Sequence, residues 1–208
     1  MVMVKEPDRL LSLAYAGAVL RPKLEAAFAL DRALADILRN VREPMIARIR
    51  LAWWREQIEA LAHGGTAAPE PLLTLLQARF AAADLTPLSD LPDAWDRLLE
   101  DPLTLEAIQR FALERAAALA SVFHAPTLTN PLTFWSLVDF AFHCSDPQLA
   151  EDVLALAGPM TPQKFKGLPR PLRVLVGLAV DDLARSDQRS PGAPVRLLRA
   201  FRHAFLTS

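Results

Sequence analysis

Proline constrains this chain more than any other residue type, because its 17 copies divide the 208 residues into short segments. Proline has no backbone N–H and disrupts the interior of a helix or a sheet, but it suits the first turn of a helix. The segments between the prolines are rich in Ala and Leu, which favour helix because they lose little side-chain entropy there. There are only 7 glycines and few runs of β-branched residues. We therefore predict an all-α protein.

Ten segments have the character of helices and none has the character of a strand. In the second segment, the apolar residues Ala27, Leu30, Leu34, Ile37 and Val41 follow the three-then-four spacing of a buried helical face. No repeat or long linker separates the segments, so residues 1–208 are predicted to form one domain, a bundle of about ten helices. The predicted helices cover residues 8–20, 22–41, 45–63, 71–84, 93–100, 104–124, 132–144, 148–157, 172–185 and 195–205.

The third segment, residues 45–63, is apolar on nearly all sides. A helix with two apolar stripes is expected inside a bundle, because each stripe needs a partner to bury it. Its polar edge includes Arg55 and Glu59, which have the spacing of a helical ion pair. The two stripes consist of Ile46, Ile49 and Trp53, and of Leu51, Trp54, Ile58 and Leu61.

The charge and the cysteine content of the chain exclude several classes of function. The formal net charge is -1, from 23 basic and 24 acidic residues, so the chain lacks the basic excess of nucleic-acid-binding proteins. The single cysteine, Cys144, excludes an internal disulfide and is expected to be a small buried side chain in a cytoplasmic protein. The longest uninterrupted apolar run, residues 174–180, is much shorter than the roughly 20 residues of a membrane span. We predict a soluble cytoplasmic protein without a signal peptide.

One short block resembles a known family. Residues Arg50 to Arg55 read Arg-Leu-Ala-Trp-Trp-Arg, which is similar to the Arg-Leu-x-Trp-Trp-Arg signature of the squalene/phytoene synthase family. That family includes a subgroup related to a mitochondrial assembly factor for respiratory complex I. The preceding Arg-Glu-Pro at 42–44, the segment Ala-Phe-Ala-Leu-Asp-Arg at 27–32 and Arg21 fit the same pattern. The resemblance covers residues 21–61 and is diffuse beyond them.

The resemblance implies an all-α bundle of the isoprenoid-synthase type. In enzymes of this family, two Asp-rich motifs on facing helices hold Mg²⁺ against the diphosphate of a prenyl donor. Mg²⁺ suits this chemistry because it prefers carboxylate and phosphate oxygens. The first motif, Asp-Asp-x-x-Asp, falls on Ala35, Asp36 and Arg39, so only Asp36 keeps its carboxylate. An arginine in place of a ligand removes an oxygen and repels the ion.

The second Asp-rich motif is also largely missing. Its nearest counterpart is residues 139–146, where Asp146 is the one residue in common with the family. Asp36 and Asp146 are therefore relic candidates for catalysis, and no metal site is predicted; Mg²⁺ would be needed only by an active enzyme. Asp36 has a second interpretation, as an exposed side chain balanced by Arg32 and Arg39 at helical spacing.

The remaining candidates are ligand-binding residues with structural alternatives. Trp53 and Trp54 could line a prenyl pocket or pack between helices, and the two roles are compatible. An anionic head group could bind to arginine, whose planar fork matches phosphate. The candidate arginines are Arg21, Arg32 and Arg50. The acidic residues Asp181 and Asp182, with Asp187 nearby, are expected on a solvated helix face, because Arg185 lies four residues after Asp181.

The C-terminal part of the chain is basic and aromatic. One basic stretch comprises Lys164, Lys166, Arg170 and Arg173, and the last predicted helix adds Arg196, Arg199 and Arg202 beside Phe201 and Phe205. Basic residues next to aromatic ones suit an anionic membrane surface or an acidic partner. The alternative is a solvated rim on a helix whose apolar face points into the core.

Two functions from different classes follow from these features. The first is a non-catalytic squalene/phytoene synthase-like protein that binds a protein partner, as an assembly or chaperone-like factor for a membrane complex, or binds an isoprenoid or another lipid. The second is a prenyl-diphosphate transferase with altered metal ligands. The lost carboxylates favour the first, which needs no cofactor. Contact with a membrane surface is compatible with both, and nucleic acid is not an expected partner.

Overall fold

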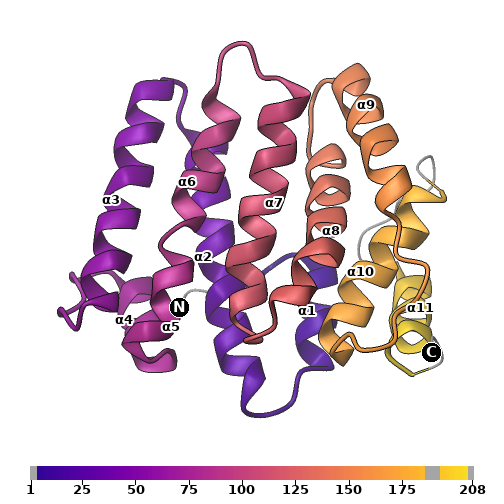
Figure 1. The fold of residues 1–208 in the computed structure, drawn as a ribbon, viewed down its shortest axis with the longest axis horizontal. Coiled ribbons are helices and arrows are strands. Elements are labelled where there is room, and N and C mark those ends of the chain that lie inside the picture. Colours follow the sequence, from indigo (N-terminus) through magenta and orange to yellow (C-terminus); the bar gives the residue numbers. More distant parts are fainter. Residues whose placement is uncertain (1–3, 186–192, 206–208) are drawn as a thin grey trace.

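A computed structural model describes residues 4–185 and 193–205, and every regular element in these ranges is helical (Figure 1). The prediction of an all-α bundle of about ten helices is confirmed. The α-helices are α1 (Pro7–Ala14), α2 (Leu20–Asn40), α3 (Pro44–Ala62), α4 (Pro71–Arg79), α5 (Ala82–Leu85), α6 (Leu91–Asp96), α7 (Leu105–Ser121), α8 (Thr129–Ala141), α9 (Pro147–Ala157), α10 (Arg170–Leu183) and α11 (Pro194–Phe205). Four single-turn 3-10 helices cover Thr86–Leu88, Arg97–Leu99, Pro126–Leu128 and Gly158–Met160.

Prolines and polar caps explain where these helices begin. Proline occupies the first turn of α1, α3, α4, α9 and α10, where its missing N–H costs no hydrogen bond. Three helices have side-chain caps that accept hydrogen bonds from free backbone N–H groups, namely Glu70 before α4, Thr104 before α7 and Asp146 before α9. The segment predicted as one helix over residues 8–20 instead ends at Ala14, and a turn containing Gly17 leads into α2.

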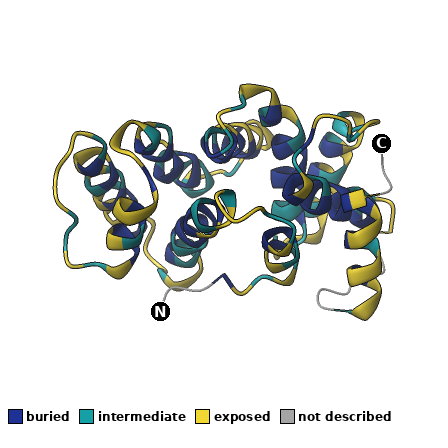
Figure 2. Cartoon of the chain, turned by 90° about the horizontal axis from the view of Figure 1, so that it is seen from below, coloured by how far each residue is buried: buried dark blue, intermediate teal, exposed yellow. Residues whose placement is uncertain are grey.

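Helices α2, α7 and α8 lie in the middle of the bundle, with α3 at one end of its long axis and α11 at the other (Figure 1). Helix α7 packs mainly on α8, and α10 packs on α11, α1 and α8. In the view from below, several helices are seen nearly end-on and their buried surfaces turn toward the middle of the bundle (Figure 2). Within the described residues, no helix combines the length and the apolar composition of a transmembrane segment.

Helix α3 lies at the edge of the bundle, so the prediction that it lies inside is wrong. The stripe that includes Leu51, Trp54 and Ile58 is buried against the neighbouring helices. The other stripe is exposed, and Trp53 keeps 39% of its surface accessible. The pattern of two apolar stripes identified a helix correctly, but only one of them has neighbours that cover it.

Cys144 is half-buried in the turn after α8, where its Sγ lies 3.5 Å from the backbone oxygen of Asp146. The expectation of a fully buried side chain is therefore wrong. The turn that carries Cys144 connects two helices at the surface, since His143 and Ser145 on either side are exposed.

Helices α10 and α11 pack closely at a glycine, Gly177. A Cβ atom added to Gly177 of α10 would lie 2.3 Å from Cγ of His203 on α11, which is far closer than van der Waals contact allows. Glycine is needed here for space, because the imidazole ring fills the position of a side chain. The sequence Val-Gly-Leu inside an otherwise apolar helix is therefore a docking point for α11.

Replacing Gly177 by alanine is expected to lower the free energy of unfolding by about 1–3 kcal/mol, because the added methyl group displaces the His203 ring. Gly158→Ala is the matched control, since nothing lies within 4 Å of a Cβ at that position. Its stability should be unchanged or slightly raised. Urea unfolding of both variants measures the difference, and equal stabilities would contradict the close packing of α11 on α10.

Candidate functional site

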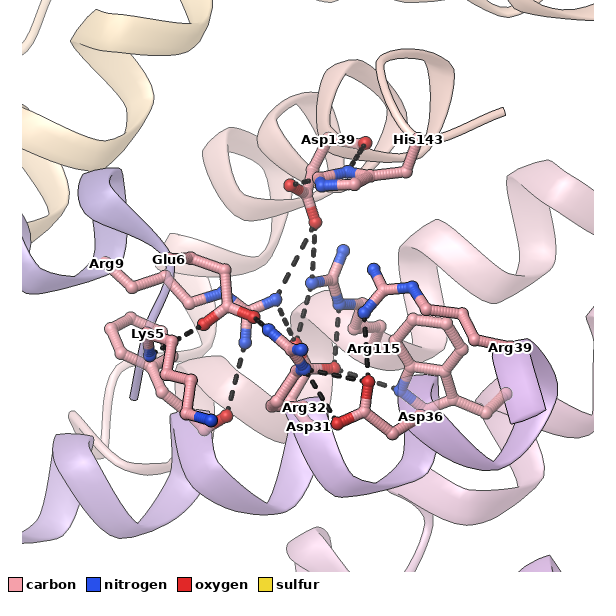
Figure 3. Close-up of polar contacts among 12 residues, drawn as sticks. Lys5, Glu6, Arg9, Asp31, Arg32, Asp36, Arg39, Arg115, Asp139 and His143 are labelled. Carbon is pink, nitrogen blue, oxygen red and sulfur yellow. Dashed lines mark hydrogen bonds and ion pairs between the residues drawn. The ribbon is translucent and has the colours of Figure 1, made fainter. Parts of the chain in front are cut away.

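Four charged side chains form a buried network in the middle of the bundle (Figure 3). Asp31 of α2 is 0% exposed and Arg115 of α7 is equally inaccessible. The Arg115 guanidinium donates to both oxygens of Asp31, through Nε at 2.9 Å and Nη2 at 2.7 Å. Arg115 Nη2 also lies 2.9 Å from Asp139 of α8. Arg9 of α1 completes the network, with its Nη2 at 2.8 Å from Asp31 and 3.8 Å from Asp139.

Aromatic side chains enclose this network. The indole N–H of Trp95 in α6 donates to Asp31 at 2.9 Å, so this buried carboxylate has three different donors. The Arg115 guanidinium carbon lies 4.3 Å from the ring centroid of Trp135, which is within the range of cation–π attraction. Arg9 lies over Phe28 and Trp135 at 5.5 and 5.7 Å. The network therefore ties five helices, α1, α2, α6, α7 and α8, to one cluster of charges.

The arginines keep both carboxylates ionised. Burial alone would raise the pKa of Asp31, but the charges of Arg115 and Arg9 outweigh it and lower the pKa below the ordinary value. The pKa of Asp139 is lowered in the same way, with burial opposed by Arg115 and Arg9. Burial would lower the pKa of Arg115, but Asp31 and Asp139 raise it. At neutral pH neither carboxylate holds a proton that it could donate to a substrate.

A pocket of about 180 Å³ opens beside the network. Its walls are apolar on one side, where Leu38, Leu98, Phe111 and Phe140 line it, and Arg115 and Asp139 form part of the polar side. Arg115 Nη1 is buried and has no hydrogen-bond partner in the protein. The site therefore combines an apolar lining with charged side chains that the protein already pairs with one another.

Charged residues of α2 form the rim of this pocket. Arg32 and Arg39 pair with Asp36 at 2.8 and 3.2 Å, and Arg32 also pairs with Glu6. The predicted pairing of Asp36 with these two arginines is confirmed, but Asp36 is half-buried and not fully exposed, with 39% of its side chain accessible. Its carboxylate lies beside these two arginines, apart from the buried pair of Asp31 and Arg115 (Figure 3).

The structure brings together only part of the predicted site. Arg32 lines the pocket and pairs with Asp36, whereas Arg21 is exposed at the start of α2. Arg50, Trp53 and Trp54 belong to α3, which does not line the pocket. Trp54 is buried and Trp53 packs against it edge-on, with ring centroids 5.2 Å apart. Packing is thus the role of Trp54 in this fold.

Asp146 has a structural role of its own. Its side chain accepts hydrogen bonds from the backbone N–H groups of Gln148 and Leu149, at 2.9 and 3.2 Å, and so caps α9. Among the described residues, no group of three or more His, Cys, Asp or Glu side chains is arranged to hold a metal ion.

Asp181 and Asp182 lie in the interface of α10 with α11, so the prediction of a solvated helix face is wrong. Asp182 pairs with Arg196 of α11 at 2.6 Å, and Asp181 lies 2.9 Å from Nε2 of His203. Both aspartates are buried because α11 covers them. The distance of four residues to Arg185 suggested an exposed ion pair, but the two carboxylates contact Arg196 and His203 of the next helix, α11. Asp187 lies outside the described residues.

Sequence reasoning missed Arg9 and Arg115, the two cations of the network. One signal was present, because Arg115 lies on the same helical face as Phe111, Ala112 and Leu119, all of which are buried. A charged residue on an apolar face needs a buried partner of opposite charge. Its partner could not be identified from spacing, since Asp31 is 84 residues away in the chain.

Comparisons of the chain with protein-family models, with curated proteins and with solved structures find no match. The resemblance to the squalene/phytoene synthase family therefore stays a prediction that depends on residues 21–61.

Proposed function

We propose that this chain is a non-catalytic protein of the squalene/phytoene synthase type, which acts by binding as an assembly or chaperone-like factor for a membrane complex. The observation that carries the proposal is the pairing of Asp31 and Asp139 with Arg9 and Arg115. These carboxylates come from two different helices, α2 and α8, and meet at the centre of the bundle.

The chemistry of this pairing differs from that of a metal site. Enzymes of the family use carboxylates on facing helices to hold Mg²⁺, and the ion then coordinates diphosphate oxygens. A guanidinium group satisfies carboxylates through N–H donors and offers no coordination position for a further oxygen. Removing one member of this largely buried ion-pair network leaves an uncompensated charge, so Mg²⁺ would have to displace arginines at a high energetic cost.

The size of the interior pocket also supports binding without prenyl transfer. Its volume of about 180 Å³ is below the roughly 300–1,000 Å³ of pockets that enclose drug-sized ligands. A prenyl chain would have to extend beyond it, so the outer surface is where a large partner can bind. A protein of this kind would act in the cytoplasm or at a membrane surface and would need no cofactor.

A second candidate function is isoprenoid or lipid binding. The observation that favours it is the combination of apolar residues and several arginines in the lining of one pocket, which suits a small amphipathic ligand with an anionic group. Prenyl-diphosphate transfer with altered ligands is the enzymatic alternative.

Titration with farnesyl diphosphate, with and without Mg²⁺, distinguishes the three functions. We expect no Mg²⁺-linked binding and no release of inorganic diphosphate, because Arg9 and Arg115 already occupy the carboxylates. A known phytoene synthase assayed in parallel is the positive control. Binding that does not require Mg²⁺ and produces no diphosphate would favour the lipid-binding function. Mg²⁺-dependent binding with diphosphate release would overturn the proposal.

A further inference from the structure

Helix α11 lies on the bundle with its apolar face turned outward. Its sequence is strongly amphipathic, and the residues at its inner face are Arg196, Ala200, His203 and Ala204, all of them buried. The large apolar residues are on the opposite face, where Leu198 is 73% exposed and Phe201 is 52% exposed. The exposed apolar residues of α11 are Val195, Leu197, Leu198, Phe201 and Phe205. The prediction that the apolar face of this helix points into the core is therefore wrong.

Specific polar contacts hold α11 in this orientation. Arg196 is buried and pairs with Asp182 of α10 and Asp8 of α1. His203 fills the space over Gly177 and reaches Asp181. These contacts are available to only one face of the helix, because Arg196 and His203 lie about two turns apart on the same side. The outward direction of Leu198 and Phe201 is thus a consequence of how α11 is anchored.

The exposed apolar surface continues from α11 onto its neighbours. The ring of Phe205 contacts Tyr15 edge-on, with centroids 5.9 Å apart. A shallow open hollow follows, lined by residues that include Phe205, Tyr15, Pro169 and Val19. Val19, at the tip of the turn before α2, is 87% exposed. We call the exposed apolar residues of α11 together with this hollow the α11 face. A single exposed apolar residue is ordinary, but a contiguous group of this size marks an interaction site.

Cations surround the α11 face. Residues 194–205 contain no Asp or Glu. Arg199 is half-buried, and Arg202 is exposed and pairs with Asp181 of α10 at 2.8 Å. Arg170 lies over the Phe205 ring at 4.9 Å. Phe165 contacts His203, with ring centroids 5.6 Å apart, and brings the exposed Lys164 and Lys166 to this end of the bundle.

We propose that the α11 face binds the surface of a membrane that contains anionic lipids. A helix with Leu and Phe on one side and Arg at its flanks suits the interface between head groups and acyl chains, where apolar residues insert and cations meet the lipid phosphates. A second copy of the chain fits this surface less well. Two identical α11 faces in contact would place Lys164, Lys166 and Arg170 of one copy near those of the other, and like charges repel. The inference does not depend on the proposed function, because an enzyme could use the same surface.

The test uses the purified chain and vesicles of phosphatidylcholine with and without phosphatidylserine. We expect binding only when phosphatidylserine is present, with weaker binding as the salt concentration rises. Exchanging Phe201 and Phe205 for serine should reduce the binding constant by about tenfold for each residue. Lys164→Gln together with Lys166→Gln should lower it several-fold and leave the apolar face intact.

A matched control lies at the other end of the molecule. Met45 and Ile49 of α3 are also exposed apolar residues, at 64% and 62%, so Met45→Ser with Ile49→Ser changes the same kind of surface. This control variant should bind the vesicles with the same binding constant as the unmodified chain. Urea unfolding confirms that each variant is folded. Absence of vesicle binding, or equal loss of binding in the α3 control, would overturn the proposal. Dimers that dissociate in the Phe201 and Phe205 variants, without vesicle binding, would show that the α11 face joins two copies instead.

Discussion

Replacing Arg115 by methionine is expected to lower the free energy of unfolding by about 3–5 kcal/mol. Methionine preserves much of the length and apolar volume of the arginine, so the change removes the charge and little of the packing. Asp31 is completely buried and would keep only Arg9 and Trp95 as donors. The loss is large because an uncompensated carboxylate in a low-dielectric interior cannot recover the solvation that folding removed.

Arg110 provides a control on the same helix. It is exposed, and its Nη2 pairs with Glu106 at 2.7 Å one helical turn away. Exposed pairs of this kind contribute about 0.3–0.5 kcal/mol, so Arg110→Met should change stability by no more than that. Urea unfolding at pH 7 of both variants gives the two values. If Arg115→Met lowered the free energy of unfolding as little as Arg110→Met does, the buried network would not contribute substantially to the stability of the fold.

The sequence predicted much of the fold because local signals were strong. The prolines at the first turns and the apolar spacing from Ala27 to Ile37 specify helices regardless of what packs against them. The pairing of Asp36 with Arg32 and Arg39 was predictable for the same reason, since all three lie within seven residues on α2. Local spacing is sufficient wherever both partners belong to one helix.

The candidate site was much less predictable because its partners come from different helices. Arg9, Asp31, Arg115 and Asp139 meet only after α1, α2, α7 and α8 have packed. No spacing rule relates residues that are 84 positions apart.

The prediction of which face of α11 is buried was wrong for a related reason. Apolar periodicity identifies the more hydrophobic face of a helix, but the ion pair between Arg196 and Asp182 turns the other face inward. A rule that places the most apolar side of a helix in the core does not take into account an ion pair with a residue of another helix.

Acid is expected to destabilise the protein strongly between about pH 5 and about pH 2, through the network around Arg115. The pKa values of Asp31 and Asp139 are lowered in the folded state, because Arg115 and Arg9 outweigh the effect of burial. A carboxylate whose pKa is lower when folded stabilises the protein fully above its unfolded pKa, and this contribution is lost as the pH falls toward its folded pKa. Each pKa unit by which folding lowers the pKa of an aspartate corresponds to about 1.4 kcal/mol of stability at neutral pH. Urea unfolding across this pH range measures the loss.

The Arg115→Met variant tests whether the network is the origin of this acid sensitivity. Without Arg115, burial acts on Asp31 with less opposition, so its folded pKa should rise toward or above the unfolded value. Protonation then costs the variant little stability, because it neutralises a charge that has lost its main partner. The stability difference between the unmodified chain and the variant should therefore be largest at pH 7 and shrink as the pH falls. If the free energies of unfolding of the two proteins fall in parallel down to about pH 3, the acid sensitivity comes from other carboxylates. Candidates are Glu6 and Asp181, whose pKa values are also lowered.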